Sequence, residues 1–328
     1  MDIGGTKCAV VAGRGDGAVA ARVAFPTGGP ADTLARAADS ARSFMKDPGI
    51  GAGERPLAVG VSCGGPLDAP RGTVLSPPNL RGWDRVAVTD ILSGALDAPA
   101  YLCNDANASA VAEWRFGAGR GLHDLAFLTF GTGMGAGLIL GGRLHEGAGG
   151  SAGEVGHVRL ERYGPVGYGK AGSFEGFCSG GGLAGLARLR NEEAAQLGQK
   201  PPFGDDPTAR EVAERADAAE PAALGALGAC GRYLGRAIAI LIDILNLEAV
   251  VIGGIYGRCR HHLEPGMRAA IAEEALPGPA AACRVLEAGL GESIGDVAAL
   301  CVAMMGARGG DAGVGRLRDR DKDQSRGR

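Results

Sequence analysis

The chain has 328 residues, of which 45% are apolar and 22% charged, with 59 glycines and a formal net charge of −3. A length beyond that of one hydrophobic core predicts two lobes, and the composition is typical of a soluble globular protein. The small net charge excludes a broad electrostatic attraction for nucleic acid, so a small-molecule partner is favoured.

Cysteine use and hydropathy indicate the compartment. Eight cysteines are scattered singly, several of them inside apolar runs such as AVGVSC and APAYLC. They predict reduced thiols in the core of a cytoplasmic protein. The longest apolar run, AIAILIDILNLEAVVIGG, is interrupted by Asp243, Asn246 and Glu248, so we expect no membrane span.

Periodicity and turn residues predict an α/β order in the N-terminal part. Two paired strands, a helix, a strand, a helix, a strand and a third helix are expected at residues 3–13, 18–25, 32–47, 56–63, 84–96, 99–103 and 104–117. Asp32 or Thr33 is expected to cap the first helix, and Pro48 with Gly49 to end it.

The C-terminal part continues this alternation. Strands are expected around the sequence GTGMG, followed by a mainly helical region, a buried strand and two helices, at residues 124–130, 136–142, 208–247, 248–254, 261–276 and 293–308. The charged, glycine-rich segment 309–328 is expected to be disordered rather than to bind a partner.

Two short loops have the composition of phosphate-binding turns, DIGGTK at 2–7 and FGTGMG at 130–135. Glycines let the backbone approach phosphate oxygens, and a hydroxyl and a lysine can bind them. The first loop alone could equally be an ordinary glycine hairpin. A dinucleotide site would need a helix after its glycines, so the apolar run AGLILGG disfavours a nicotinamide-dependent oxidoreductase. The pair of strand–Gly–Thr–strand hairpins instead predicts a duplicated fold with a phosphate loop in each half.

A polar pair, Asn104 and Asp105, stands where a strand is predicted to end and a helix to begin. Asp105 could act only as a helix cap, because Asn and Asp are favoured there. Its alternative role is a general base. Phosphoryl transfer needs alignment, charge neutralisation and one carboxylate that accepts the proton of the attacking hydroxyl.

The ordered set of motifs resembles the ROK family (repressor, open reading frame, kinase), within the hexokinase–actin–Hsp70 ATPase fold. The matching segments are DIGGTK at 2–7, GVSCGGPLD at 60–68, SPPNLRGWD at 76–84, NDANASAVAEW at 104–114, FGTGMGAGLILGGRLHEGAGGSAGEVGH at 130–157 and VVIGG at 250–254. The resemblance implies an α/β protein of two-lobed actin-like ATPase (ribonuclease H-like) fold. It has a small lobe at 1–106, a large lobe at 107–292 and a helix at about 293–308 that packs back on the small lobe.

The resemblance also implies a reaction and its residues. ATP with Mg²⁺ would donate its γ-phosphoryl to a sugar hydroxyl, usually the 6-hydroxyl, with Asp105 as the catalytic base and Asp2 acting on magnesium through water. Sugar contacts are implied for Gly65, Asn79, Asn104, Asp105, Glu154, His157 and Glu175. Nucleotide contacts are implied for Asp2, Gly4, Gly5, Thr6 and Lys7, for Gly131, Thr132 and Gly133, and for Gly253 and Gly254 beside the adenosine.

The resemblance also implies which partners the protein has. Members that repress transcription carry a winged helix-turn-helix before the first loop, whereas this chain has only Met1 before its motif, so no DNA binding is expected. Because members usually have several residues before that motif, either the true start lies upstream or the first strand is short. Members are commonly dimers, so a homodimer is expected.

The segment EVGHVRLERYGPVGYGKAGSFEGF (154–177) departs from the family pattern. Many members follow the histidine of their ExGH motif with three cysteines that join it in binding a structural zinc ion. Here Tyr168 and Ser173 stand at two of these positions and Val166 near the third, so no structural zinc is expected. Packing of Tyr168 and Phe174 is the candidate for ordering the loop instead.

Several alternatives stay open. Glucose is the first candidate substrate, because SPPNLRGWD and the set of Glu154, His157 and Glu175 resemble those of glucokinases. Kinases of N-acetylmannosamine, N-acetylglucosamine, fructose or allose share nearly all of these residues. A non-catalytic sugar-binding sensor is disfavoured by Asp105 and by both phosphate loops. A simple pairing of Glu154 with His157 at helical spacing is disfavoured because glycines surround them.

Overall fold

The computed structural model describes residues 1–308, which form two compact units. Of the described residues, unit 1 comprises 1–116, 146–150 and 292–308, and unit 2 comprises 117–145 and 151–291. The predicted lobe boundary falls after residue 106, whereas the helix that begins at Asp105 belongs to unit 1. The tail at 309–328, expected to be disordered, lies outside the described residues.

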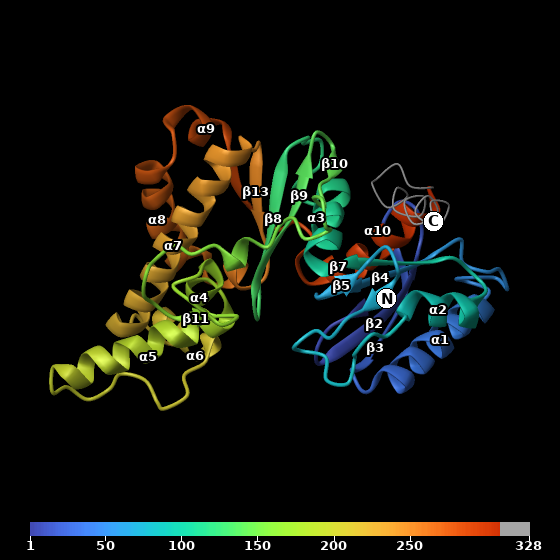
Figure 1. The fold of residues 1–328 in the computed structure, drawn as a ribbon, viewed down its shortest axis with the longest axis horizontal. Helices are drawn as coiled ribbons and strands as arrows, with labels where there is room; N and C mark the ends of the chain where they lie inside the picture. The colour runs from blue at the N-terminus through green and yellow to red at the C-terminus, as the bar shows by residue number, and fades with distance from the viewer. Residues whose placement is uncertain (309–328) are drawn as a thin grey trace, which may run out of the picture. The chain divides into compact units, whose positions relative to one another are not determined.

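Unit 1 is built on a five-stranded sheet with the strand order β3-β2-β1-β4-β7 (Figure 1). Strand β1 pairs antiparallel with β2 and parallel with β4, and β4 pairs parallel with β7. The antiparallel pairing of β2 with β3 confirms the predicted hairpin at the start of the chain. The strands are β1 Asp2–Ile3, β2 Lys7–Gly13, β3 Val19–Pro26, β4 Val59–Cys63 and β7 Ala100–Asn104, with a small hairpin of β5 Leu67–Asp68 and β6 Thr73–Val74.

Helices cover both faces of this sheet: α1 Pro30–Lys46, α2 Val88–Leu96, α3 Asp105–Phe116 and α10 Ile294–Ala307. Buried Leu34 of α1 and Leu92 of α2 share one core with Val61 of β4. On the opposite face, α10 approaches Gly60 of β4 so closely that a Cβ there would lie 2.2 Å from the carbonyl oxygen of Ala299. A glycine at this position therefore permits the packing of α10 on the sheet.

The first helix starts earlier than predicted. It begins at Pro30, after Gly29, so the expected caps Asp32 and Thr33 lie in its first turn. Proline is favoured at the first helical position because its fixed φ suits the helix and it has no N–H to leave unpaired. The Thr33 hydroxyl instead accepts the backbone N–H of Gly28 at 3.0 Å, which fixes the chain as it enters the helix.

Unit 2 repeats the topology of unit 1, with the strand order β10-β9-β8-β13-β14. Strand β8 pairs antiparallel with β9 and parallel with β13, which pairs parallel with β14. The shared pattern of an antiparallel hairpin followed by parallel strands confirms the predicted duplication. The strands are β8 Leu125–Phe130, β9 Met134–Leu140, β10 Arg143–Leu144, β13 Ala249–Ile252 and β14 Arg284–Glu287, with a hairpin of β11 Val166–Gly167 and β12 Lys170–Ala171.

The helices of unit 2 pack mainly around α7 (Figure 1). They are α4 Phe174–Phe177, α5 Gly180–Gln196, α6 Ala209–Asp217, α7 Pro221–Leu245, α8 Ile255–Glu274 and α9 Pro277–Ala282. By length and hydropathy α7 could cross a membrane, but 67% of its most apolar window is buried inside the protein. Leu227, Leu234 and Ile238 of this helix are fully enclosed in the core, so its place in the core accounts for its apolar sequence.

The cysteines have the environment expected of core thiols. All eight are free, and all except the half-buried Cys283 are buried. Burial raises the pKa of the Cys259 and Cys283 thiols to about 11. These thiols therefore stay protonated and unreactive at neutral pH.

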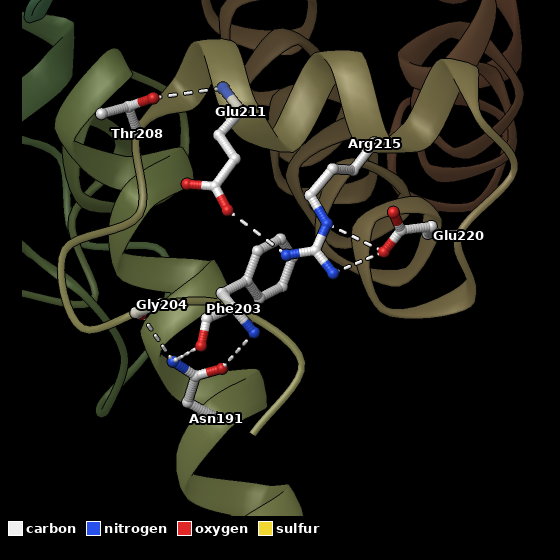
Figure 2. Close-up of polar contacts among 7 residues, drawn as sticks. All are labelled: Asn191, Phe203, Gly204, Thr208, Glu211, Arg215 and Glu220. Carbon is white, nitrogen blue, oxygen red and sulfur yellow. Dashed lines mark hydrogen bonds and ion pairs between the residues drawn. The ribbon is translucent and has the colours of Figure 1, made fainter. Parts of the chain in front are cut away.

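Side-chain hydrogen bonds hold the loop that follows α5 (Figure 2). The Asn191 amide donates to the carbonyl oxygens of Phe203 and Gly204 at 3.2 and 3.1 Å. Its oxygen accepts the N–H of Phe203 at 2.8 Å. One side chain thus satisfies three backbone groups of a loop that has no regular structure of its own.

A second set of contacts in the same view fixes α6. The Thr208 hydroxyl caps the helix by accepting the N–H of Glu211 at 3.1 Å. Near the other end of α6, Arg215 donates to Glu220 at 2.8 Å and to Glu211 at 3.3 Å, and its guanidinium lies 4.5 Å from the centre of the Phe203 ring. Both ends of α6 are therefore anchored by side chains.

Candidate active site

The predicted site residues divide between the two units. In unit 1, a tight turn joins β1 to β2, closed by the N–H of Gly4 and the carbonyl oxygen of Lys7 at 3.0 Å. The Thr27 hydroxyl donates to the Gly4 carbonyl oxygen at 2.7 Å. A Cβ on Gly5 would lie 2.8 Å from the carbonyl oxygen of Asn79. The glycines therefore permit a close approach that brings the predicted phosphate loop and Asn79 together.

Asp2 is half-buried on the short strand β1. Burial raises the pKa of Asp2, the adjacent N-terminal ammonium lowers it, and the negative charge of Asp105 raises it further. A Cβ on Gly295, in the first turn of α10, would lie 2.7 Å from Asp2 Oδ2. Two carboxylates of unit 1 thus lie near enough to repel each other, which a divalent cation between them would relieve.

The structure separates the two roles that the sequence leaves open at the start of α3. The Asn104 side-chain oxygen accepts the N–H groups of Ala106 and Asn107 at 3.0 and 3.2 Å. Asn104 is therefore the N-cap of α3. Asp105 follows as the first helical residue, and its Oδ1 accepts the adjacent N–H of Ala106 at 2.8 Å.

Asp105 retains a carboxylate oxygen that faces the end of the neighbouring strand. A Cβ on Gly64 would lie 3.6 Å from Asp105 Oδ2, and one on Gly65 would lie 3.8 Å from Asn104 Nδ2. The pKa of Asp105 is raised, chiefly because surrounding protein atoms weaken the hydration of its carboxyl group. Water still reaches this side chain, which offsets part of that effect.

These residues share one edge of the sheet in unit 1. Strands β1, β4 and β7 run parallel, so their carboxyl ends meet at the same edge. The phosphate loop leaves β1, Gly65 follows β4, and Asn104 ends β7. Ligands of open α/β sheets bind at such an edge, and this arrangement can hold a polar ligand beside one exposed carboxylate.

The second glycine loop in unit 2 contacts one of the predicted sugar residues. Glu175 Oε2 accepts the N–H of Met134 at 3.0 Å, and a Cβ on Gly133 would lie 2.7 Å from the same oxygen. The Gly131 N–H donates to the Gly133 carbonyl oxygen at 3.1 Å, which closes the turn between β8 and β9. Thr132 at its tip is exposed, so its hydroxyl is accessible to a ligand.

Two helix N-termini adjoin this loop, and one of them is not anticipated by the sequence reasoning. Gly254 precedes α8 with φ 69°, and a Cβ there would lie 2.1 Å from the carbonyl oxygen of Phe130. Helix α5 begins after Ser179, and the N–H of Gly180 donates to the Gly131 carbonyl oxygen at 2.8 Å. Helix N-termini attract anions. A serine followed by three glycines is the signal that could have predicted the second one.

The segment from Glu154 to Glu175 also lies in unit 2. Val155–His157 forms one 3-10 turn, although the surrounding glycines made helical structure unexpected. A Cβ on Gly156 would lie 2.0 Å from the carbonyl oxygen of Met134, so this turn packs against the start of β9. Glu154 and His157 are both exposed and are therefore accessible to a ligand.

Contacts of the following hairpin, β11–β12, stabilise this segment. The Lys170 ammonium donates to the carbonyl oxygen of His157 at 2.7 Å, and Arg159 donates to the Ala171 carbonyl oxygen at 2.7 Å. The Tyr168 ring lies edge-on to the His157 imidazole, with 6.3 Å between ring centroids. Phe174, in contrast, is buried in the core. The expected absence of a structural zinc ion in this loop stays a prediction, and Lys170 is a contact that the sequence reasoning missed.

Two α/β units of matching topology, each with a glycine loop at the carboxyl edge of its sheet, define the actin-like ATPase class. The ROK family matches residues 1–305. A glucokinase of Streptomyces coelicolor is 32% identical over 266 residues, which cover 77% of this chain and 80% of that protein. An N-acetylmannosamine kinase of Escherichia fergusonii is 32% identical over 80% of this chain and 84% of its own.

Solved structures agree with these relatives. A ROK family glucokinase from Streptomyces griseus, in complex with glucose and AMPPNP, is 30% identical and superposes with a TM-score of 0.71 over 93% of this chain and 98% of its own. The chain therefore belongs to the ROK family and has its actin-like ATPase fold. The sugar kinases among its relatives support a ROK sugar kinase.

Proposed function

We propose that the protein transfers the γ-phosphoryl group of ATP to the 6-hydroxyl of a hexose, with glucose as the first candidate. The observation that carries this proposal is the division of roles at the start of α3. Asn104 caps the helix, so the structure does not need Asp105 for that purpose. Its free carboxylate oxygen beside Gly64 suits a general base.

In the proposed reaction, Asp105 accepts the proton of the sugar hydroxyl as its oxygen attacks the γ-phosphorus. The bond between this phosphorus and the bridging oxygen breaks, and ADP leaves with the bond electrons. Such a transfer depends mainly on positioning and on neutralising charge. Exposed Thr132 and the N-terminus of α8 in unit 2, with Thr6 and Lys7 in unit 1, are proposed to bind the phosphates and the adenosine.

The residues of unit 1 also fit a Mg²⁺ ion. Oxygen ligands suit this ion. Burial raises the pKa of Asp2, and the negative charge of nearby Asp105 raises it further. We assign Asp2 to hold the ion through water, where the ion would neutralise negative charge on the phosphates. In the same unit, Asn104 and Asn79 would orient the sugar toward Asp105.

Sugar contacts from unit 2 are proposed for Glu154, His157 and Glu175. The carboxylates can accept hydroxyl protons, and the imidazole can donate or accept a hydrogen bond. A site built to bond sugar hydroxyls rejects analogues that lack them, because its polar groups would lose partners on desolvation. These residues fit glucose, but N-acetylmannosamine, N-acetylglucosamine, fructose and allose present similar hydroxyls and remain alternatives.

The test is an assay of ADP release with Mg-ATP against glucose, mannose, fructose, allose, N-acetylglucosamine and N-acetylmannosamine. We expect kcat/KM to favour one of these hexoses by at least ~10-fold over the next, as polar pockets discriminate in this range or beyond. Phosphate on the 6-hydroxyl is identified in the product by NMR. Turnover of an acetylated sugar in preference to glucose would support the proposed kinase activity but show that glucose is not its substrate.

A sugar-binding sensor is the second candidate, since it would keep the same sugar contacts. Such a protein would gain thermal stability with a sugar but release no ADP with any sugar of the panel. That combination would refute the kinase. We further propose that the protein is cytoplasmic, in keeping with its free, buried thiols, and that it forms a homodimer. Light scattering at several protein concentrations tests the dimer.

A further inference from the structure

Two adjacent histidines on α8 converge on one carboxylate at the end of α6. His261 Nε2 and His262 Nε2 lie 3.2 and 2.9 Å from Asp217 Oδ1. The two imidazole rings lie 3.8 Å apart between centroids and are tilted by 44°. Successive residues of a helix point about 100° apart. Their ring nitrogens therefore meet only because both rings turn toward Asp217.

We propose that Asp217, His261 and His262 bind one divalent transition-metal ion of the zinc class, with water completing the coordination. The three ligand atoms lie within 4.8 Å of one another. A tetrahedral ion with bonds of about 2.0–2.1 Å holds neighbouring ligand atoms about 3.3 Å apart. The two N···O separations, 3.2 and 2.9 Å, are close to this value. With the ion bound, each imidazole would carry its proton on Nδ1 instead of on the Nε2 that bonds Asp217, and would offer the Nε2 lone pair to the ion.

The ligand set favours Zn²⁺ or Ni²⁺ over the Mg²⁺ that accompanies ATP. Imidazole nitrogen suits late transition metals, whereas Mg²⁺ prefers an octahedron of oxygen ligands. The cluster shares no residue with the segment 154–177, where the absence of cysteines predicts no structural zinc. It is also independent of the proposed kinase reaction, because none of its residues is assigned to sugar or nucleotide.

The cluster is accessible to solvent, and neighbouring contacts fix the end of α6 on which Asp217 lies. Asp217 follows Arg215, whose ion pairs with Glu211 and Glu220 fix this end of α6 (Figure 2). The side chain of His262 is only 14% exposed, whereas those of His261 and Asp217 are 63% and 60% exposed. One ligand is thus anchored by packing, and an ion can enter from water past the other two.

The charge of the site also suits a cation. Asp217 brings a carboxylate group within hydrogen-bonding distance of both imidazole rings, and a carboxylate oxygen is a ligand that such ions accept. Bound metal would cross-link α6 to α8, the helix that begins directly after Gly254. We therefore expect metal binding to raise the thermal stability of unit 2.

The test is calorimetric titration of chelator-stripped full-length protein with ZnCl₂ and NiCl₂. We expect saturable binding of one ion per chain, a rise in Tm, and no displacement by millimolar Mg²⁺. Asp217→Asn and His262→Gln should each weaken binding by more than the roughly 10- to 100-fold that loss of an outer partner of a metal ligand costs. Asp217 is the last residue of α6 and His262 lies within α8, and both substitutions nearly keep the size of the side chain.

Two control variants exclude other ligands. His145→Gln removes an exposed histidine elsewhere in unit 2, and Cys283→Ser removes the half-buried thiol. Neither change should alter the affinity or the Tm shift. Binding that persists in Asp217→Asn and His262→Gln, or that disappears in Cys283→Ser, would overturn the assignment. The absence of saturable binding would do the same and leave the cluster as a hydrogen-bonded link between two helices.

Discussion

Replacing Asp105 with Asn is expected to abolish most of the turnover while leaving the fold intact. Asn has nearly the same shape, and its side-chain oxygen can still accept the N–H of Ala106, which Asp105 Oδ1 accepts at 2.8 Å. Asn104 continues to cap α3. A positioned general base contributes about 10²- to 10⁴-fold, which corresponds to about 2.7–5.5 kcal/mol of transition-state stabilisation. The KM for the sugar should change by only a few-fold.

The pH dependence of turnover provides a second readout of the same residue. A general base must be unprotonated, so kcat/KM should fall as the pH falls through the pKa of Asp105. Loss of hydration around the carboxyl group raises that pKa. The midpoint of the acid limb should therefore lie at a pH above about 3.9, the usual pKa of Asp. In Asp105→Asn the residual rate should lack this limb.

The assay is ADP release at saturating Mg-ATP from pH 4 to pH 9, with Tm measured on the same samples. Asp90→Asn is the matched control, because Asp90 is likewise exposed in the first turn of a helix but has no assigned role. A kcat for Asp105→Asn within about threefold of the parent, well below the usual worth of a base, would refute the assignment. An unchanged acid limb in that variant would refute it equally.

Three further predictions concern the loop, the N-terminus and the packing. Lys170→Met should raise the sugar KM by about 3- to 10-fold with kcat little changed, because a partly screened, charge-assisted hydrogen bond to the His157 carbonyl is worth about 1 kcal/mol. Burial lowers the pKa of the Met1 amino group from 8.0 to about 6. The unfolded chain therefore takes up this proton first as pH falls from 8 to 6, and urea denaturation should show a loss of about 2 kcal/mol over that range. Gly60→Ala should destabilise unit 1 by about 1–3 kcal/mol, because its Cβ would collide with the Ala299 carbonyl oxygen.

Each of these has a control within the chain. Lys46→Met removes an exposed lysine from unit 1 and should leave the sugar KM unchanged; an equal effect would show that Lys170 acts only through net charge. Acetylating the amino group of Met1 should remove its share of the pH dependence, and persistence of that share would assign it to other groups. Gly94→Ala adds a methyl group in open space on α2. Gly94→Ala should be neutral or should stabilise unit 1 by up to about 1 kcal/mol. An equally small effect of Gly60→Ala would contradict the close packing of α10 against Gly60.

Local sequence signals predicted those elements whose stability is itself local. The hairpin β2–β3 and the hairpin β8–β9 each join two apolar strands by glycine-rich turns, so alternation and turn chemistry identify them directly. The duplicated topology was predicted from a different pair, the glycine loops that join β1 to β2 and β8 to β9. The capping of α3 was readable in the same way, because Asn104 and the N–H groups that it accepts lie within three positions of each other.

Features that depend on contacts distant in sequence were not predictable. Helix α8 begins at Ile255, whereas the sequence predicted a start at 261. It follows a turn at Gly254, which lies against the carbonyl oxygen of Phe130 in another strand. Lys170 reaches His157 across 13 positions. The cluster of Asp217 with His261 spans 44 positions. A single sequence carries no signal for such separations, since only the folded packing of helices and strands sets them.

The division of roles between Asn104 and Asp105 explains why two polar residues are needed at this one junction. A carboxylate used as the N-cap would accept several helix N–H groups, and that would lower its pKa and weaken it as a base. With Asn104 accepting the N–H groups of Ala106 and Asn107, Asp105 shares only the first of them. Its own N–H and that of Ala106 lower its pKa, but crowding by protein atoms outweighs them. The carboxylate therefore binds a proton more readily than an ordinary aspartate, as proton transfer from a sugar hydroxyl requires.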